Sequence, residues 1–399
     1  MTENERKAVL RGGMSGSWQS EPWLGGYYGE EEVEAVVRVL RASIRDTSVG
    51  FGFICDEIEE FERVFAEYIG TKYAISIANA GVGLDMSMRT LDLEPHDEVI
   101  VPSINYWAAP MAVLGQRAKL VLCEVDPVTF CADPNDVEKR ITPNTRAILP
   151  THMNGMSAPM DDLMELGRRH PHPKHGPIRV IGDAARAVGG GYRGTKIGKK
   201  GWMNIFSFHT MKNMTTLGEG GAITTDYDEL VPRLRQMRHF GQDYWSTNYK
   251  ITKLQAAVGP IQVRRLDGFI AARRRLGAQR TKLLEGCPHL VLPSEPEGHY
   301  HSYYLYTVLV SSAWAGNKRD ELIRLLIEKH GVHCQVLNPP VHRVVPYIAE
   351  HTKAQHLPLS DELGKRLFCL PIHPCMSEED NHYISAALWD AADEVASSS

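Results

Sequence analysis

Between residues 73 and 225, short runs rich in isoleucine and valine alternate with segments whose apolar residues recur at helical spacing. This alternation predicts strands separated by helices. Strands that are apolar throughout need cover on both faces, as in a parallel sheet between two helical layers. The predicted fold class is therefore α/β, with a mostly parallel central sheet flanked by helices. The predicted strands cover residues 73–77, 98–101, 119–123, 146–149, 178–181, 204–208 and 222–225.

The pattern changes in the C-terminal third of the chain. Helical periodicity runs through residues 253–284, and we expect Pro260 to interrupt that segment or to mark a boundary within it, because proline has no N–H to donate. Past Gly286, a predicted strand at 303–310 precedes a predicted helix at 318–330, which indicates a smaller α+β unit. We predict an N-terminal arm (1–28), a large domain (29–265) and a small C-terminal domain (266–399).

Composition excludes several classes of function. The net charge of −5 provides no positive field for nucleic acid or an anionic membrane, and no apolar run approaches the roughly 20 residues that span a bilayer. The seven cysteines show no CxxC spacing, and no apolar signal core follows Met1, so we expect a cytoplasmic protein. The histidines between 170 and 175 lie among prolines, so we interpret them as a surface loop and expect no metal site.

One lysine stands out at the end of a predicted buried strand. Lys212 follows Ser207 by five residues, and Gly218, Gly220 and Gly221 come next. Burial lowers the pKa of an amine, and a neutral amine is a nucleophile toward carbonyls. The segment is therefore open to two interpretations. It is either a Schiff-base lysine beside a phosphate-binding hydroxyl, or a surface-loop lysine followed by hinge glycines.

Three other strand ends carry residues that fit one cofactor. Ala80 and Gly81 form a turn of small residues that opens a helix, where backbone N–H groups suit a phosphate. Tyr106 offers a ring that could stack on a planar molecule, and Asp183 needs a cationic partner if it is buried. Together with Lys212, these features indicate a site for pyridoxal 5′-phosphate (PLP), whose protonated ring acts as an electron sink.

Several longer segments allow a comparison with a known family. They are residues 97–103, 182–185, 207–209 with 212–213, 218–221, 254–259 and 370–374. In these segments the sequence resembles the DegT/StrS family of PLP-dependent sugar aminotransferases, which have the aspartate aminotransferase fold (fold type I). The resemblance runs from about Tyr28 to Trp389.

The resemblance implies roles for the residues of the cofactor site. Lys212 would bind the cofactor covalently and move the proton, and Asp183 would pair with the pyridine nitrogen. Tyr106 would stack on the ring. The phosphate would be held by Ser207 and by the backbone at Ala80 and Gly81.

Further residues gain roles from the same resemblance. Asn248 would reach the phosphate of the neighbouring subunit, which implies a homodimer with shared active sites. His209 and His342 fall in regions that would face the substrate, although each could equally be a packed or surface histidine.

The sequence also departs from the family pattern. Ala80 and Gly81 stand where Gly-Thr is usual, and Arg186 stands where glutamine usually lies next to the ring oxygen of the cofactor. Arg186 would favour the ionised ring oxygen, or would bind a carboxylate or phosphate of the substrate. Lys250 replaces a usual arginine, and Pro159 replaces a frequent aspartate.

The resemblance implies transfer of an amino group from glutamate or glutamine to a keto sugar. A nucleotide-linked deoxysugar is the expected acceptor, in secondary-metabolite or glycan biosynthesis. Two alternatives stay open: an aminotransferase acting on a cyclitol or aminoglycoside ketone, and a PLP-binding protein with a regulatory or non-catalytic role. The intact set of Lys212, Asp183 and Ser207 favours an enzyme.

Overall fold

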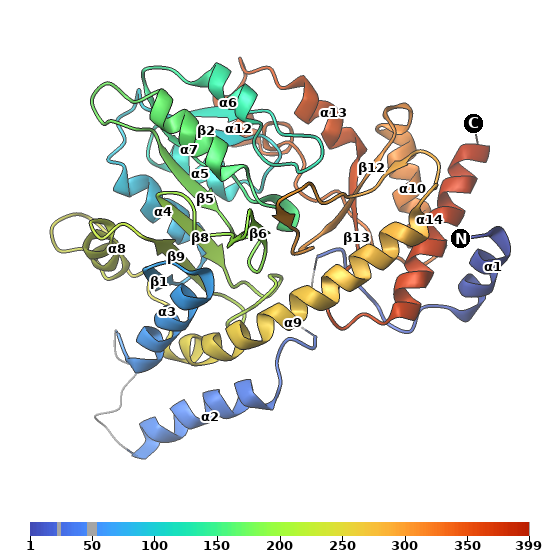
Figure 1. The fold of residues 1–399 in the computed structure, drawn as a ribbon, viewed down its shortest axis with the longest axis horizontal. Coiled ribbons are helices and arrows are strands. Elements are labelled where there is room, and N and C mark those ends of the chain that lie inside the picture. Colours follow the sequence, from blue (N-terminus) through green and yellow to red (C-terminus); the bar gives the residue numbers. More distant parts are fainter. Residues whose placement is uncertain (22–24, 46–53, 399) are drawn as a thin grey trace.

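The computed structural model describes residues 1–21, 25–45 and 54–398 (Figure 1). Its central sheet has seven strands in the order β1-β9-β8-β5-β4-β2-β3. The pairs that β9 makes are antiparallel and the other pairs are parallel, which confirms the predicted α/β class. The strands are β1 (Tyr73–Ile77), β2 (Glu98–Pro102), β3 (Lys119–Cys123), β4 (Thr145–Ile148), β5 (Arg179–Asp183), β8 (Met203–Ser207) and β9 (Gly221–Thr225).

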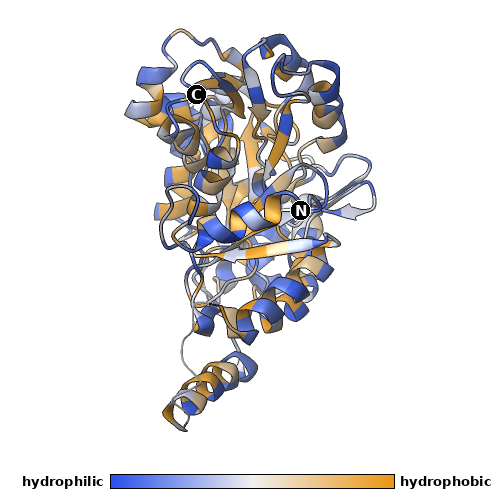
Figure 2. Cartoon of the chain, turned by 90° about the vertical axis from the view of Figure 1, so that its left-hand side faces the viewer, coloured by the Kyte–Doolittle hydropathy of each residue, from blue (hydrophilic) through white to orange (hydrophobic). Residues whose placement is uncertain are grey.

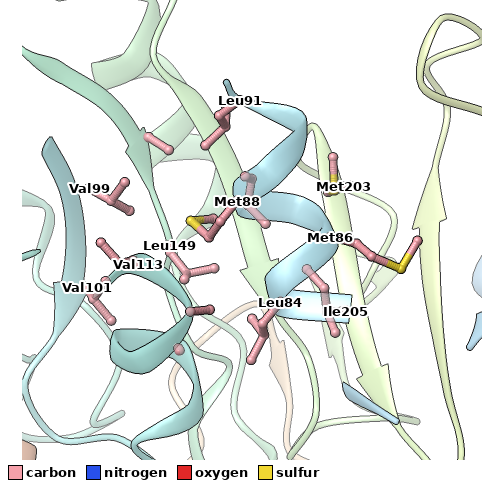
Figure 3. Close-up of a cluster of buried hydrophobic side chains, with 14 of the residues drawn as sticks. Leu84, Met86, Met88, Leu91, Val99, Val101, Val113, Leu149, Met203 and Ile205 are labelled. Atoms are coloured by element: carbon pink, nitrogen blue, oxygen red, sulfur yellow. The ribbon is translucent and has the colours of Figure 1, made fainter. Parts of the chain in front are cut away.

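Helices cover both faces of this sheet because its strands are apolar on both sides. In β8, Ile205 belongs to the cluster around α4, which also contains Leu84 and Met88 (Figure 3). The next residue, Phe206, points to the other face and packs edge-on against Phe65 of α3. The helices of these two layers are α3 (Asp56–Ile69), α4 (Ala80–Thr90), α5 (Ala108–Gly115), α6 (Pro134–Arg140), α7 (Met160–Arg169) and α8 (Leu230–Arg238).

The long helix α9 (Lys253–Leu284) is continuous over 32 residues and contains Pro260. The expected interruption at Pro260 was therefore wrong. Helix α9 packs along its length against α2 (Glu30–Arg45), α3 and α14 (Glu378–Ser397), and this packing outweighs the single hydrogen bond that proline cannot donate. The boundary that we placed between residues 265 and 266 falls inside α9, and the division into two domains stays a prediction.

A second, smaller sheet lies in the C-terminal part of the chain. It has three antiparallel strands in the order β10-β12-β13 and packs with α10 and α14 around a shared apolar core. Its elements are β10 (Leu290–Val291), β12 (Tyr306–Val310), β13 (Leu367–Leu370) and α10 (Asn317–Glu328). The remaining short elements are β6 (Gly191–Tyr192), β7 (Thr195–Lys196), β11 (His299–Tyr300), α11 (Val341–Val344), α12 (Pro346–His351), α13 (Pro358–Arg366), and the 3₁₀ turns Met153–Gly155 and Ser312–Trp314.

The N-terminal arm contains a helix that its sequence pattern did not predict. Helix α1 (Glu3–Gly12) is short and has no buried residue, so hydrophobic periodicity does not reveal it. A capping box forms between Thr2 and Glu5, and this spacing is the signal that could have located its start. The helix lies against α14, where Arg6 pairs with Asp393 at 2.8 Å.

Helix α2 keeps part of its apolar face uncovered within one chain. It lies at the bottom of the molecule in Figures 1 and 2, and packs against α9. Val33, Leu40 and Ile44 share one side of the helix and are 52%, 42% and 82% exposed. None of the helices in the described residues is long and apolar enough to span a bilayer.

Candidate active site

One edge of the central sheet brings Ser207, Gly221 and the start of α4 together. In the strand register, Gly221 of β9 pairs with Ile77 of β1 on one side and with Ser207 of β8 on the other. Helix α4 begins at Ala80, just beyond β1, so the backbone N–H groups of Ala80 and Gly81 lie at the same edge. The first N–H groups of a helix have no partner within it, and they suit an anion.

Close backbone packing shapes this edge. A Cβ atom on Gly221 would lie 2.9 Å from the carbonyl carbon of Asn79 and 3.0 Å from the backbone nitrogen of Ala80, so only glycine fits. Ser207 is buried, and its Oγ accepts the N–H of His209 at 3.3 Å. Among the described residues, no acceptor takes the hydroxyl proton of Ser207, which can therefore point toward a bound phosphate.

Asp183 ends β5, directly beside β8, and its side chain is buried. Within the described part of the chain, its carboxylate accepts one hydrogen bond, from the backbone N–H of Ala185 at 3.1 Å. Burial raises the pKa of Asp183, although this N–H and the charges of Arg186 and Lys212 act in the opposite direction. A buried carboxyl with a single neutral donor suits a protonated ring nitrogen as a second partner.

Lys212 lies in the loop between β8 and β9, and its Nζ donates to Tyr304 Oη at 3.2 Å. Burial and, to a lesser extent, the charge of Arg186 lower the pKa of Lys212 to about 7, while Glu21 and Asp183 oppose the shift. Near neutral pH, roughly half of the Lys212 side chains are therefore neutral amines. A neutral amine can attack an aldehyde.

Arg186 connects this loop to the other side of the site. Its guanidinium carbon lies 5.4 Å from the ring centre of Tyr106 and 5.5 Å from that of Tyr304. Nη1 of Arg186 lies 3.5 Å from Glu21 Oε1, and the same carboxylate oxygen accepts the hydroxyl of Tyr304 at 2.7 Å. Tyr106 is 41% exposed, and its ring also stacks on that of Trp107, with 4.2 Å between the ring centres.

His209 lies in the same loop as Lys212 and is partly exposed. Its backbone oxygen accepts the N–H of Lys212 at 2.9 Å, and its ring Nε2 lies 3.9 Å from Glu219. The ring Nδ1 also accepts the backbone N–H of Met211 at 3.3 Å.

His342 is placed differently. Its buried ring contacts Ser103 Oγ at 2.9 Å through Nδ1 and Asp361 at 3.0 Å through Nε2. Both ring nitrogens are engaged, so the structure gives no support to the expected contact with substrate.

Asn248 lies next to a segment that touches the turn before α4. The carbonyl of Tyr249 accepts the N–H of Ala78 at 2.8 Å, which fixes this segment beside the end of β1. Asn248 itself is exposed, and its Oδ1 accepts the N–H of Lys250 at 3.3 Å. Its amide nitrogen is therefore presented at the surface.

Sequence reasoning missed Tyr304 and Glu21. Tyr304 precedes β12 and is completely buried, and Glu21 lies in the N-terminal arm. Neither belongs to a motif, and both are remote in sequence from Lys212. Only the packing of the arm and of the C-terminal part against the central sheet reveals them.

Comparisons with known proteins agree with this arrangement. Residues 28–389 match the DegT/DnrJ/EryC1/StrS aminotransferase family. The chain belongs to this family. It is 37% identical over 340 residues to GDP-perosamine synthase of Caulobacter vibrioides, which covers 83% of this chain and 89% of that protein. It is 34% identical over 381 residues to the dTDP-3-amino-3,4,6-trideoxy-alpha-D-glucose transaminase of Streptomyces venezuelae, covering 94% of this chain and 97% of that one.

Solved structures show the same fold. The crystal structure of S. venezuelae DesV in complex with ketimine intermediate superposes with a TM-score of 0.84 at 32% identity, covering 94% of this chain and 99% of that chain. The protein is thus an aminotransferase by family, and membership implies PLP as the cofactor. The residues present fit PLP, because a buried carboxyl, a weakly basic lysine and a helix N-terminus meet at one edge of the sheet.

Proposed function

We propose that the protein transfers an amino group from glutamate or glutamine to a keto sugar, with PLP held at Lys212. The observation that carries this proposal is the position of Lys212. Its amine lies in the loop after β8, which pairs with β5, and β5 ends at the buried carboxyl of Asp183; burial there lowers the pKa of the amine to about 7. Two relatives are named as enzymes of nucleotide-linked amino sugars, which supports a nucleotide-linked deoxysugar as the acceptor.

The residues of the site divide the binding of PLP among them. The backbone N–H groups of Ala80 and Gly81 and the hydroxyl of Ser207 would hold the phosphate, which is anionic and prefers a helix N-terminus. Tyr106 would cover one face of the ring. Asp183 would keep the ring nitrogen protonated, since a cation next to a buried carboxylate stabilises both charges.

When bound, PLP takes up the electron pair that is released as the C–H bond of the amino donor breaks. Lys212 would then move the proton. The amine of the donor would take the place of Lys212 on the cofactor and free its Nζ. The free Nζ could then accept the proton from the donor carbon and return it to the cofactor. A base is most efficient when its pKa lies near the operating pH, and a value of about 7 meets that condition. His209, in the same loop, would contact substrate hydroxyls.

A homodimer with shared active sites completes the proposal. The exposed side chains Val33, Leu40 and Ile44 of α2 form an apolar strip that a second chain could cover. In such a dimer the exposed amide of Asn248 would donate to the phosphate in the partner's site. A two-fold interface would complete both sites at once.

Borohydride reduction of the PLP-loaded protein tests cofactor binding. It should fix the cofactor to the peptide that contains Lys212, and Lys212→Ala should abolish the label. Lys72→Ala, which removes an exposed lysine paired with Asp228, should keep it. A label that survives Lys212→Ala would refute the assignment.

A panel of acceptors tests the reaction. The amine form of the cofactor is generated with glutamate or glutamine, and its loss is followed with nucleotide-linked keto sugars and with cyclitol ketones. Loss with a keto sugar supports the proposal. Loss with cyclitol ketones alone would favour the cyclitol alternative, and formation of no amine form with either donor would favour a non-catalytic role.

A further inference from the structure

Arg186 is held in position by rings and has few hydrogen-bond partners. Its side chain is buried between the rings of Tyr106 and Tyr304. A guanidinium offers five N–H donors in one plane. Among the described residues, the one acceptor of Arg186 is Glu21, at 3.5 Å from Nη1, which is long for such a bond. Packing therefore fixes Arg186, and most of its donors remain available to a ligand.

A carboxylate of the protein already lies in front of these donors. Glu21 accepts a hydrogen bond from Tyr304 Oη at 2.7 Å, and Tyr304 Oη accepts one from Lys212 Nζ at 3.2 Å. Burial raises the pKa of Glu21, but the charges of Arg186 and Lys212, together with the hydrogen bonds from Tyr304 and Arg186, hold it below its ordinary value. Glu21 is therefore ionised at neutral pH, and its carboxylate lies two hydrogen bonds from the reactive amine.

The backbone that carries Glu21 is anchored. Ser20 is completely buried, and its hydroxyl donates to the carbonyl of His333 at 3.1 Å. Trp18 Nε1 donates to Asp380 at 2.7 Å, which ties the arm to α14. The Glu21 carboxylate can therefore leave Arg186 by rotation of its side chain alone, without movement of the arm.

We propose that Arg186 and Tyr304 form the subsite for the carboxylate of the amino donor, and that Glu21 occupies this subsite until the donor binds. The inference rests on the proposed aminotransferase function. An α-amino acid carries its carboxylate on the carbon that bears the amine. When the donor amine takes the place of Lys212 Nζ, the donor carboxylate must lie near that atom. The carboxylate of Glu21 lies in this region when no donor is bound.

The chemistry of the guanidinium favours this ligand. A planar carboxylate can pair with a guanidinium through two parallel hydrogen bonds, and a glutamine side chain at position 186 could not offer both. The ketone of a keto sugar carries no carboxylate, so Glu21 can return to Arg186 in the second half of the reaction. The pair Glu21–Arg186 would thus discriminate between donor and acceptor.

Equilibrium binding of glutarate, a dicarboxylate without an amine, to the PLP-loaded protein tests the subsite by calorimetry. Arg186→Gln should weaken binding at least about tenfold, because it removes the charge and the planar fork. Glu21→Gln should strengthen binding by about tenfold, because the competing charge is gone while the hydrogen bond from Tyr304 is kept. Glu328→Gln, in an exposed pair with Arg324 on α10, is the matched control and should change nothing.

A double variant separates a loss of glutarate binding from a loss of folding. Arg186→Gln leaves Glu21 without its cation, so the double variant Glu21→Gln/Arg186→Gln restores neutrality and should unfold at the wild-type temperature while still binding glutarate weakly. In this double variant, a glutarate affinity equal to that of Glu21→Gln alone overturns the proposal, because the two proteins differ only at Arg186. A selective loss of affinity for the nucleotide-linked sugar, with donor affinity intact, also overturns it and assigns Arg186 to the acceptor.

The failure of the subsite is distinguishable from the failure of the function. Stopped-flow absorbance follows formation of the amine form of the cofactor with glutamate in the wild-type protein. If the wild type reacts and Arg186→Gln keeps the same donor dissociation constant, the function stands and the subsite is wrong. If the wild type does not react with any donor, the proposed function itself fails.

Discussion

Replacing Lys212 by methionine should stabilise the cofactor-free protein at mildly acidic pH. Burial and Arg186 lower the pKa of Lys212 from 10.5 to about 7, and this drop corresponds to roughly 5 kcal/mol at about 1.4 kcal/mol per pH unit. Lys212 is partly exposed in the site, and screening by water reduces the figure, so we expect a gain between about 2 and 5 kcal/mol.

The sign of the pH dependence follows from the two states. Between pH 7 and 10.5 the unfolded chain keeps the proton of Lys212 and the folded chain does not. The unfolded state then binds more protons, so the stability of the wild-type protein rises with pH relative to the variant. The penalty of the buried ammonium is complete below pH 7 and falls toward zero near pH 10.5.

Thermal unfolding of the two cofactor-free proteins from pH 6 to pH 10 measures this difference. Lys212→Met should unfold at the higher temperature at pH 6, and the gap should close as the pH rises. The control Lys72→Met removes an exposed lysine that pairs with Asp228 and should give no gain at any pH. A gap that is independent of pH, or a less stable Lys212→Met at pH 6, would refute the reasoning.

Three further predictions concern the cofactor. Asp183→Asn should retain PLP, as measured by absorbance, but should slow the half-reaction with glutamate on the order of 100-fold, because the ring nitrogen loses its stabilising charge; a normal rate would contradict this role. Gly221→Ala should lower the free energy of unfolding by about 1–3 kcal/mol and should also lower the PLP content, because the new Cβ would lie 3.0 Å from the nitrogen of Ala80. Gly115→Ala serves as the control, since its Cβ would meet no atom within 4 Å. Asn248→Ala should weaken PLP retention, and mixing it with Lys212→Ala should restore activity if Asn248 serves the partner's site; no recovery would place its role within one chain.

Much of the site could be predicted because it lies on consecutive strand ends. Ser207, Asp183 and Ala80 each follow or end an apolar strand, and a parallel sheet gathers such ends at one edge whatever the order of the strands. For Lys212 the local pattern, a lone lysine after a buried strand and before three glycines, also allowed a surface loop, and the other strand ends together with the family resemblance favoured the cofactor lysine. The apolar runs in the sequence therefore indicate both where the strands end and which residues lie at the site.

The rest depends on contacts between segments that are remote in the chain. Tyr304 and Glu21 are 283 positions apart, and no periodicity or spacing predicts their hydrogen bond. Pro260 misled for a related reason, since a helix that is packed against α2, α3 and α14 tolerates a residue that local propensity forbids. His342 has the residue type of a ligand, but its partners Ser103 and Asp361 are visible only in the folded chain.

Arg186 shows how such remote contacts change the meaning of a departure from a family pattern. Considered alone, a cation in place of a neutral glutamine should lower the pKa of Lys212 further and make its amine too weak a base. In the fold, the negative charge of Glu21 lies beside Arg186 and opposes that shift. If the charges of the two residues compensate each other, removing Glu21 alone should lower the pKa of Lys212 more than removing both residues does. Only the single change leaves the positive charge of Arg186 without a nearby negative charge.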